Sequence, residues 1–445
     1  MSGPDLHLAD LRGLAEREDL AEFVRRAVRL HPSDLADVLA ALDQPARARA
    51  VAELPVEAAS RALAEMDAAE HPEEMLLAAG PDYAAELVEE LSSDDAADIV
   101  GVLAPDEREA VLSEVEDRAD VERLLTYPEE SAGGLMTTEV VAVSEDASLA
   151  EAIEEIRRQS EESDELFQVY AVDGRGRLKG VVPFVRLIVT PPTRRVRDVM
   201  EPAPAVVHPE QDQEQVARLM ARYNVAAMPV VDRDETLLGR ITFDDVIDVV
   251  EAETTEDLLK FGGVNPEEHL TASWLGAVTS RLPWLYVNLL TAFLAGAVVY
   301  LFQGTISRVV ALAVWMPVIA GMGGNAGTQA LAVTVRRLAL KELPQGRALS
   351  VIWKEMRVGA VNGIATGSVV ALVAGVTGEG WVLGLVVLLA MWGNLLVAGF
   401  AGAFIPILLE SRGVDPAIAS SIFVTTFTDV CGFLLLLGLG TVLLM

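Results

Sequence analysis

The sequence predicts a multidomain membrane protein with three parts: an α-helical, superhelical domain at the front, an α/β pair in the middle, and an all-α membrane domain of five helices. Three observations lead to this prediction. The charge changes sharply near residue 270, helix-start signals recur at a nearly constant spacing before residue 130, and five long apolar stretches follow residue 280. Short β-branched runs between these regions predict the α/β pair.

The charge distribution separates an acidic front from a nearly neutral back. The 445 residues include 67 acidic and 34 basic side chains; residues 271–445 hold 6 and 9 of them, so residues 1–270 hold 61 and 25. The front therefore carries a formal charge of −36 and the back +3. Such a front repels nucleic acid and anionic lipid and can attract cations, so we expect no nucleic-acid partner. A salt-adapted or simply well-solvated surface would give the same composition, and this alternative stays open.

The opening residues and the cysteine count restrict the compartment and the chemistry. The first 19 residues carry seven charges and lack the uninterrupted apolar core of a signal peptide, so we expect the front to stay in the cytoplasm. The single cysteine, Cys431, excludes an internal disulfide and a cysteine-based metal cluster.

Short amphipathic helices are predicted over residues 20–130, because a helix-start signal recurs there. The signal is a proline near one or more acids, and it occurs at Pro32, Pro55, Pro81 and Pro105, which are 23, 26 and 24 residues apart. Proline suits the first helical turn because its missing N–H is not needed there, and the acids meet the positive end of the helix dipole. Such a regular spacing predicts a small superhelical array of helices.

One of these predicted helices carries a group of aspartates. Asp94, Asp95 and Asp98 follow two serines, and Asp94 and Asp98 are one helical turn apart on the same face. Two like charges at this spacing repel each other. Either they are simply solvated or a cation lies between them, and the sequence leaves both explanations open.

From residue 135 the chain shows a β-α-β-β-α pattern twice. The first copy has predicted strands at 136–143, 167–172 and 180–184 and a helix at 149–159. The second has extended segments at 198–200, 205–207, 227–231 and 239–245, a helix at 212–223, and a closing helix at 246–252. The second copy closes with Gly239-Arg-Ile-Thr-Phe-Asp-Asp245, and this repeat resembles a pair of CBS domains over residues 136–252.

The resemblance to CBS domains implies a nucleotide cleft. In such pairs the threonine and aspartate of the closing motif hold the ribose hydroxyls of an adenosine, which implies Thr242 and Asp245 here. The matching stretch of the first copy, residues 180–186, lacks both residues. At most one cleft therefore looks intact. Alternatively, Thr242 only caps the following helix.

Acids crowd the closing helix of the second copy and the segment after it. They are Asp244, Asp245, Asp248, Glu251, Glu253, Glu256 and Asp257. Several are three or four residues apart, so one helical face is strongly negative. Divalent cations with oxygen ligands would relieve the repulsion.

Five apolar stretches are long enough to cross a bilayer, which takes about twenty residues each. They lie near residues 282–302, 309–334, 358–376, 381–407 and 416–444. Basic residues crowd between the second and third stretches, at Arg336, Arg337, Lys341, Arg347, Lys354 and Arg357. The positive-inside tendency places this loop in the cytoplasm, so five spans leave the N-terminus inside and the C-terminus outside.

The second span contains a glycine-rich run with two amides, over residues 317–329. Gly321, Gly323, Gly324 and Gly327 permit either close helix packing or a broken helix whose carbonyls line a watery path. Asn325 and Gln329 are four residues apart and share a face.

The last span carries one acid, Asp429, shortly after Thr425, Thr426 and Thr428. An ionisable side chain at this depth costs roughly 2.5 to 3.5 kcal/mol on insertion scales unless it faces water, a partner or an ion. Asp429 is therefore a candidate for the point where a cation passes. The alternative is a carboxyl group that bonds to a neighbouring helix.

With these motifs in this order, the whole chain resembles the MgtE family of magnesium channels and transporters. The motifs are Ser131-Ala-Gly-Gly-Leu-Met-Thr137 before the CBS pair, the glycine-rich run, Asp415-Pro416-Ala417, and Thr425-Thr-Phe-Thr-Asp-Val-Cys-Gly-Phe433. The resemblance implies a helical N-domain at 1–130, tandem CBS domains at 131–253, a connecting helix at 254–280 and a five-helix pore domain at 281–445.

The resemblance also implies roles for individual residues. It implies a homodimer in the inner membrane with a pore on the two-fold axis, where Asp429 binds hydrated Mg²⁺ together with Asn325. The expected pore-lining residues are Gly324, Gly327, Gln329, Thr425 and Thr428. The residues that match a cytoplasmic Mg²⁺ sensor are Asp94, Asp95, Asp98, Asp245, Asp248, Glu256 and Asp257. ATP or another adenine nucleotide is an expected ligand of the CBS pair.

The chemistry of Mg²⁺ agrees with these roles, because this ion sheds water reluctantly and is usually held by one or two carboxylates plus retained waters. We expect internal Mg²⁺ to bridge the acidic faces and hold the gate shut. When Mg²⁺ is scarce, these faces repel each other and the connecting helix moves to open the inner mouth.

Other functions are weighed by their motifs. A carrier for Co²⁺ or Mn²⁺, or one coupled to protons through Asp429, remains the main alternative. An enzyme is not expected, since the five histidines form no His-Glu-x-x-His motif and no lysine precedes Ser or Thr as in a P-loop. A membrane-anchored sensor without transport would leave Asp429 and the glycine-rich run without a role.

Overall fold

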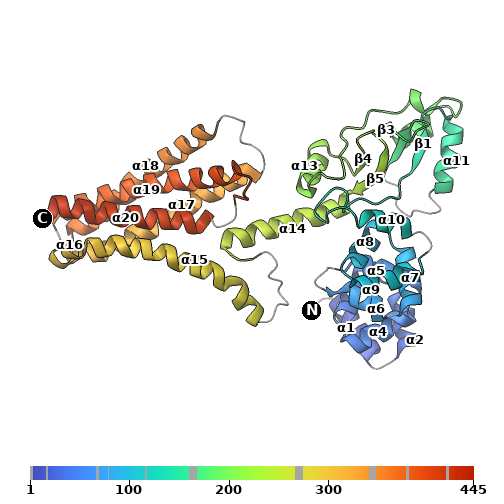
Figure 1. The fold of residues 1–445 in the computed structure, drawn as a ribbon, viewed down its shortest axis with the longest axis horizontal. Helices are drawn as coiled ribbons and strands as arrows, with labels where there is room; N and C mark the ends of the chain where they lie inside the picture. Colours follow the sequence, from blue (N-terminus) through green and yellow to red (C-terminus); the bar gives the residue numbers. More distant parts are fainter. Residues whose placement is uncertain are drawn as a thin grey trace. The chain divides into compact units, whose positions relative to one another are not determined.

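The computed structural model describes residues 4–16, 19–66, 70–78, 80–115, 118–159, 168–265, 274–339, 347–376, 380–416 and 420–445. The chain forms two compact units, Met1–Glu253 and Thr254–Met445, which are considered separately (Figure 1).

The front of the first unit is a series of short helices that pack in sequence order. They are α1 (Pro4–Glu16), α2 (Leu20–Ala27), α3 (Pro32–Ala40), α4 (Gln44–Glu53), α5 (Val56–Ala64), α6 (Pro72–Ala78), α7 (Pro81–Glu90), α8 (Ser93–Gly101), α9 (Pro105–Leu112) and α10 (Arg118–Leu124). The predicted helix starts are confirmed, because Pro32, Pro81 and Pro105 are first residues of helices and Pro55 is the N-cap of α5. Each period of the repeat holds two helices.

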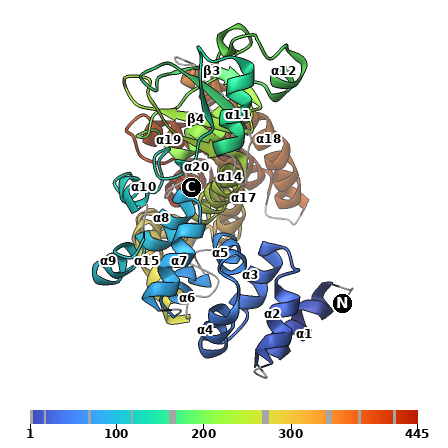
Figure 2. The ribbon, with the colours of Figure 1, turned by 90° about the vertical axis from the view of Figure 1, so that its right-hand side faces the viewer.

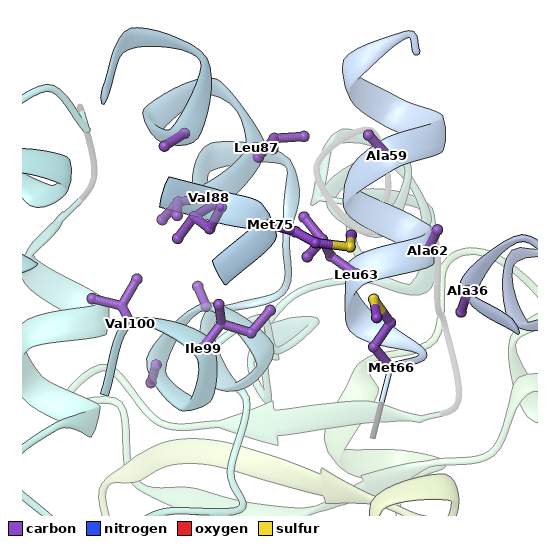
Figure 3. Packing of buried hydrophobic residues seen from close by; sticks show 14 of the residues in the cluster. Ala36, Ala59, Ala62, Leu63, Met66, Met75, Leu87, Val88, Ile99 and Val100 are labelled. Atoms are coloured by element: carbon purple, nitrogen blue, oxygen red, sulfur yellow. The ribbon is translucent and has the colours of Figure 1, made fainter. Parts of the chain in front are cut away.

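Small and medium-sized residues let these short helices approach closely. Ala36 of α3, Ala62 and Leu63 of α5, Leu87 of α7 and Ile99 of α8 are almost fully buried and face a common interior (Figure 3). Helices α1 to α4 lie at the end of the unit far from β3 and α12 (Figure 2). One hydrophobic core continues from α8 into the second α/β copy.

The α/β part of the first unit contains the two predicted copies. The first holds β1 (Ala142–Ser144), α11 (Leu149–Gln159), β2 (Val169–Val172), β3 (Leu178–Val182) and α12 (Phe184–Val189). A 3₁₀ turn η2 (Val196–Asp198) leads to the second, which holds α13 (Gln213–Tyr223), β4 (Ala227–Val231), β5 (Leu237–Thr242) and α14 (Phe243–Gly262). The predicted β-α-β-β-α pattern is confirmed; Phe167, at one predicted strand end, lies outside the described residues.

The sheet of each copy also pairs with an extended segment that precedes the other copy in sequence. Two of the predicted strands are therefore corrected. Thr137 pairs with Arg240 of β5, and Glu201 pairs with Val181 of β3. The predicted strand at 136–143 is therefore divided between the two sheets, and the segment at 198–201 completes the first sheet. Glycines make both pairings possible. A Cβ at Gly239 would lie 2.4 Å from the Thr137 carbonyl oxygen, and one at Gly180 would lie 2.4 Å from that of Glu201.

The connecting helix predicted over 254–280 differs in the structure. Residues 254–262 belong to α14, which starts in the first unit, and residues 274–280 belong to the first long helix of the second unit. Helix α14 ends because Gly263 adopts a φ of +72° and Val264 N–H donates to the Leu259 carbonyl, the bond pattern of a Schellman cap. Residues 266–273 lie outside the described ranges.

The second unit consists of long helices, as predicted. They are α15 (Trp274–Leu301), α17 (Ala311–Ala339), α18 (Ala348–Val376), α19 (Trp381–Glu410) and α20 (Ser420–Leu444), with a short α16 (Gln303–Arg308) between the first two. Within the part of the chain that the structure describes, α15, α18, α19 and α20 are long and apolar enough to cross a membrane. Helix α17 is equally long, but its glycines and the amides Asn325 and Gln329 lower its apolarity.

Helix α19 lies at the centre of the second unit and packs against α17, α18 and α20 (Figure 1). Glycines allow the closest approaches. A Cβ at Gly359 of α18 would lie 2.2 Å from the Leu395 carbonyl oxygen of α19, and one at Gly399 would lie 2.4 Å from that of Glu355. Four of the predicted loop cations, Arg336, Arg337, Lys354 and Arg357, lie on α17 or α18 rather than in a loop; Lys341 lies outside the described residues.

Candidate ion-binding sites

Four aspartates of the first unit form what we term the acidic group: Asp94, Asp95 and Asp98 of α8 and Asp245 of α14. Asp94 and Asp95 lie in the first turn of α8, where the helix dipole favours negative charge. Asp245 belongs to the group because its pKa is raised by Asp94 and it raises the pKa of Asp95 in turn. The packing of α8 near the start of α14 thus brings together acids that are about 150 residues apart in sequence, which the spacing of residues along one helix cannot do.

Burial and mutual repulsion raise the pKa of all four carboxyls. Burial is the largest cause in each case, and it raises the pKa of Asp94 to about 6, of Asp95 to about 8, and of Asp98 and Asp245 to about 7. Repulsion from the neighbouring acids also contributes to these raised values, whereas a hydrogen bond from Ser92 opposes the rise at Asp95. A cation among these carboxylates would reverse both effects, because it stabilises their charged forms.

Asp94 gives the most direct indication that the acidic group could bind a ligand. It is only 9% exposed, and its Oδ1 has no hydrogen-bond partner among the described residues. A buried oxygen without a partner is costly unless water or an ion satisfies it. No three His, Cys, Asp or Glu side chains in the described ranges converge into a preformed metal cage. Carboxylate oxygens suit a hard divalent cation such as Mg²⁺, which usually keeps several of its waters.

Two further acids adjoin the group that sequence reasoning missed. Glu139 raises the pKa of Asp94, and Glu129 raises that of Asp98. Ser93 Oγ donates to Glu139 Oε2 at 3.0 Å, and Thr137 also donates to this carboxylate. Glu139 is 46 residues from Ser93. No local spacing could have shown their contact.

The other predicted sensor residues lie further along α14. Asp248 and Asp257 are exposed, and Glu256 pairs with Lys260. Lys260 Nζ also donates to Asp415 Oδ2 at 2.8 Å, across 155 residues of sequence. A lysine ammonium thus lies between two carboxylates where the sequence led us to expect a metal ion. The two acids together raise the pKa of Lys260 although its burial opposes this.

The tentative nucleotide residues contact each other. Thr242 Oγ1 donates to Asp245 Oδ2 at 2.6 Å, and the Thr242 N–H donates to the same oxygen at 3.2 Å. Asp245 therefore caps the start of α14 while it faces the acidic group. Their role in binding a nucleotide stays a prediction.

In the second unit, α17 presents a polar face to its surroundings. Gly321, Asn325 and Gln329 are exposed, whereas Gly323 and Gly327 on the opposite side are buried against α19 and α20. The predicted pairing of the two amides on one face agrees with this burial pattern.

Helix α20 lies beside α17 and carries the predicted pore acid. Thr425 is exposed and Asp429 is half-buried. Two predicted pore-lining residues are placed differently. Thr428 is fully buried, and Gly327 is buried because a Cβ there would lie 2.5 Å from Val424 Cγ1. Both positions contribute to helix packing in the single chain, since small residues allow close contact between the helices.

Comparison with known proteins assigns the family. A family model described as "Divalent cation transporter" matches residues 316–439, an "MgtE intracellular N domain" model matches 30–130, and the CBS domain model matches 132–188 and 196–252. The "Magnesium transporter MgtE" of Thermus thermophilus is 40% identical over 335 residues, which cover 74% of this chain and 73% of that relative.

The chain belongs to the MgtE family. The magnesium transporter MgtE of Enterococcus faecalis is 35% identical over 326 residues, which cover 73% of this chain and 72% of that protein. A membrane protein of a magnesium-transporting family, with a soluble N-terminal part, is therefore established, and the recognition made from the sequence motifs is confirmed.

Solved structures resemble the first unit. One is the soluble part of a magnesium transporter, with a TM-score of 0.52 and 28% identity over 56% of this chain and 99% of that one. Another is the cytosolic domain of the Mg²⁺ channel MgtE in complex with ATP, with a TM-score of 0.51 and 35% identity over 54% and 99%. The predicted helical N-domain and CBS pair are thereby confirmed as an MgtE-type cytosolic part.

Proposed function

We propose that this MgtE protein is a magnesium-selective channel or transporter that admits Mg²⁺ through the cytoplasmic membrane as a homodimer and is controlled by internal Mg²⁺. The observation that carries the proposal is the polar exposed face of α17 beside Asp429 of α20.

The exposed faces of α15 and α17 differ in polarity, because α15 carries the single exposed amide Asn288 among apolar side chains, whereas α17 carries two, Asn325 and Gln329, on one face. Leu290, Phe293 and Leu294 of α15 are more than half exposed, as suits a helix in contact with lipid. Asn325 and Gln329 of α17 are exposed at comparable depth within a long helix. Amide groups facing hydrocarbon would leave strong donors and acceptors unpaired, which costs several kcal/mol. This face therefore borders water or a second copy of the chain.

A homodimer would let this polar face of α17 border both a second copy of the chain and water. Two copies related by a two-fold axis would place two Asp429 carboxylates around one hydrated Mg²⁺. Asn325 would accept or donate hydrogen bonds to the water shell, and Thr425 and Gln329 would extend the polar path. The ion would not need to lose its whole hydration shell, which agrees with the few charged ligands available.

Control by internal Mg²⁺ is supported by the acidic group. Asp94, Asp95 and Asp245 lie close enough to raise each other's pKa, so an ion that bridges α8 and α14 would stabilise the arrangement seen here. Helix α14 continues from this group to residue 262 in the second unit. An ion bound at its start would thus influence the segment that leads to the spans.

Orientation and nucleotide binding belong to the same proposal. The N-terminal part lies in the cytoplasm and the C-terminus outside, in agreement with the basic residues at the end of α17 and the start of α18. An adenine nucleotide such as ATP binds the CBS pair near Thr242 and Asp245. One solved relative of the first unit is named as a complex with ATP, which supports this assignment.

The test is Mg²⁺ flux into liposomes that contain the purified full chain, with internal Mg²⁺ varied. We expect uptake that falls as internal Mg²⁺ rises. Competition with Co²⁺ and Mn²⁺, and uptake with and without a pH gradient, separate this proposal from a carrier for another ion or a proton-coupled one. Uptake that Co²⁺ abolishes at concentrations far below those of Mg²⁺ would contradict magnesium selectivity.

A further inference from the structure

An asparagine in the centre of α19 is a fully buried polar side chain beside the proposed ion path. Asn394 is 0% exposed, and its Nδ2 donates to the Ile319 carbonyl of α17 at 3.0 Å. Its Oδ1 has no hydrogen-bond partner among the described residues. An unsatisfied buried acceptor costs about 1–3 kcal/mol, so packing alone does not account for an amide at this position.

Glycines on two neighbouring helices leave room for this amide. A Cβ at Gly323 of α17 would lie 2.2 Å from Asn394 Nδ2, and a Cβ at Gly432 of α20 would lie 2.7 Å from it. Any side chain at either glycine would have to displace the amide. Asn394 therefore contacts both α17 and α20 at this level.

This level is the one that carries the proposed pore residues. Gly323 is two residues before Asn325, and Gly432 is three residues after Asp429. Thr428, which directly precedes Asp429, also packs at Gly323, because its Cβ would lie 3.2 Å from a Cβ added there. The amide is thus wedged between the two helix segments that present Asn325 and Asp429.

The bond to Ile319 acts on the glycine-rich turn itself. In a regular helix the Ile319 carbonyl accepts the N–H of the residue four positions on, which is Gly323. Asn394 supplies this carbonyl with a second donor from another helix. The turn that precedes Asn325 is therefore held from α19 as well as by its own helix.

We propose that Asn394 is a positioning residue for ion selection, which fixes the spacing of α17 and α20 and thereby the distance between the Asn325 amide and the Asp429 carboxylate. This inference rests on the proposed function. A hydrated ion is recognised through the positions of groups that bond to its waters, so a small change in this spacing alters which divalent ion fits.

The test compares Mg²⁺ and Ca²⁺ flux through the full chain in liposomes for the wild type, Asn394→Leu and Gly432→Ala. Leucine keeps the branching of asparagine but removes both polar atoms, and alanine at 432 pushes on the amide from the other helix. We expect each variant to shift the Mg²⁺-to-Ca²⁺ flux ratio and the half-saturating Mg²⁺ concentration by about 10-fold, which corresponds to about 1.4 kcal/mol. Since the two changes act on one contact, the double variant should shift the ratio by less than the product of the single effects.

A matched control and two references separate the outcomes. Met391→Leu changes a fully buried residue in the same helix at nearly constant volume and should leave the ratio unchanged. Variants that lower only the maximal flux per folded protein, with wild-type ratio and half-saturation, would show a purely structural role and overturn the inference. If the wild type carries Mg²⁺ no better than Asp429→Ala, the proposed function fails, and this inference with it.

Discussion

The acids of the two units are arranged in opposite ways. In the first unit, Asp94, Asp95, Asp98 and Asp245 gather where α8 meets α14, and their repulsion raises the pKa of each. In the long helices of the second unit, Asp429 stands within an apolar span without another acid near it in sequence. The difference fits the two tasks that we propose: the grouped carboxylates would respond to the concentration of a cation, whereas one carboxylate per chain would admit it.

The largest effect is expected from the single acid. Asp429→Ala should lower Mg²⁺ flux by at least about 100-fold, equivalent to about 2.7 kcal/mol, because both carboxylates of the proposed dimeric site would be lost. Flux into liposomes at equal amounts of folded protein measures this. Glu410→Ala removes an exposed acid at the end of α19 and should conduct normally. Equal flux through the Asp429 variant and the wild type would contradict the proposed role of Asp429 in conduction, since Asp429 would then be structural.

Removal of charge from both helices of the proposed sensor should abolish control by internal Mg²⁺ without abolishing conduction. Asp98→Asn combined with Asp248→Asn weakens the attraction of α8 and α14 for Mg²⁺, so flux should no longer fall as internal Mg²⁺ rises. The measurement is flux against internal Mg²⁺ concentration. Asp34→Asn with Asp37→Asn, which alters two exposed acids of α3, is the matched control. An unchanged response of the first pair would remove these residues from the sensor.

The pH dependence of stability should distinguish the acidic group from ordinary surface acids. The folded-state pKa values of about 6 to 8 exceed the usual 3.8, so the folded state binds more protons than the unfolded state between these values. Without divalent ions, stability therefore falls as the pH rises from about 4 to 8. We expect a loss of about 2 kcal/mol, or roughly 4–8 °C in Tm.

Mg²⁺ should reverse this loss, because it replaces the protons that the carboxylates release. Differential scanning calorimetry of the full chain in detergent, at pH 5.5 and pH 8.5 with and without Mg²⁺, makes the measurement. Asp95→Asn should reduce both the pH dependence and the gain from Mg²⁺. A gain from Mg²⁺ that is larger at pH 5.5 would contradict the assignment of the ion to these acids.

A smaller effect is expected at Lys260, whose ammonium lies between two carboxylates. Lys260→Gln leaves Glu256 and Asp415 without the ammonium between them, so the free energy of unfolding should fall by about 1 kcal/mol, as for a partly exposed ion pair. Mg²⁺ should then stabilise the variant more than the wild type. Arg233→Gln, at an exposed pair with Glu210, should change neither quantity. Equal Tm values for Lys260→Gln and wild type would show that the contact contributes nothing.

The smallest effect is expected from Glu139, which adjoins the acidic group. Glu139→Gln removes a neighbouring charge that raises the pKa of Asp94, but keeps the acceptor for Ser93 Oγ. The internal Mg²⁺ concentration that halves flux should rise by about threefold, the effect of roughly 0.6 kcal/mol. Glu145→Gln, in the turn after β1, serves as the control. A fall in that concentration would mean that Glu139 opposes Mg²⁺ binding.

The helices and strands that could be predicted are those specified by residues close together in sequence. Proline and acids at helix starts predicted α3, α5, α7 and α9, and alternating patterns predicted the strands β4 and β5, because these signals act over a few residues. The apolar lengths predicted the long helices in the same way. Predictions failed where a residue distant in sequence determines the local structure. Thr137 pairs with Arg240 because Gly239 has no side chain to block it, and Thr428 is buried because α17 packs over it.

The sequence by itself determined the order of the parts, the positions of most helices and the family, since composition, periodicity and motif order are properties of neighbouring residues. Only the tertiary structure decided that Glu139 joins the acidic group, that Lys260 lies between Glu256 and Asp415, and that Asn394 contacts both α17 and α20. These contacts join residues 46 to 155 positions apart or lie between helices whose facing sides depend on packing. Their energies come from burial and from charges brought together in space, which no local pattern records.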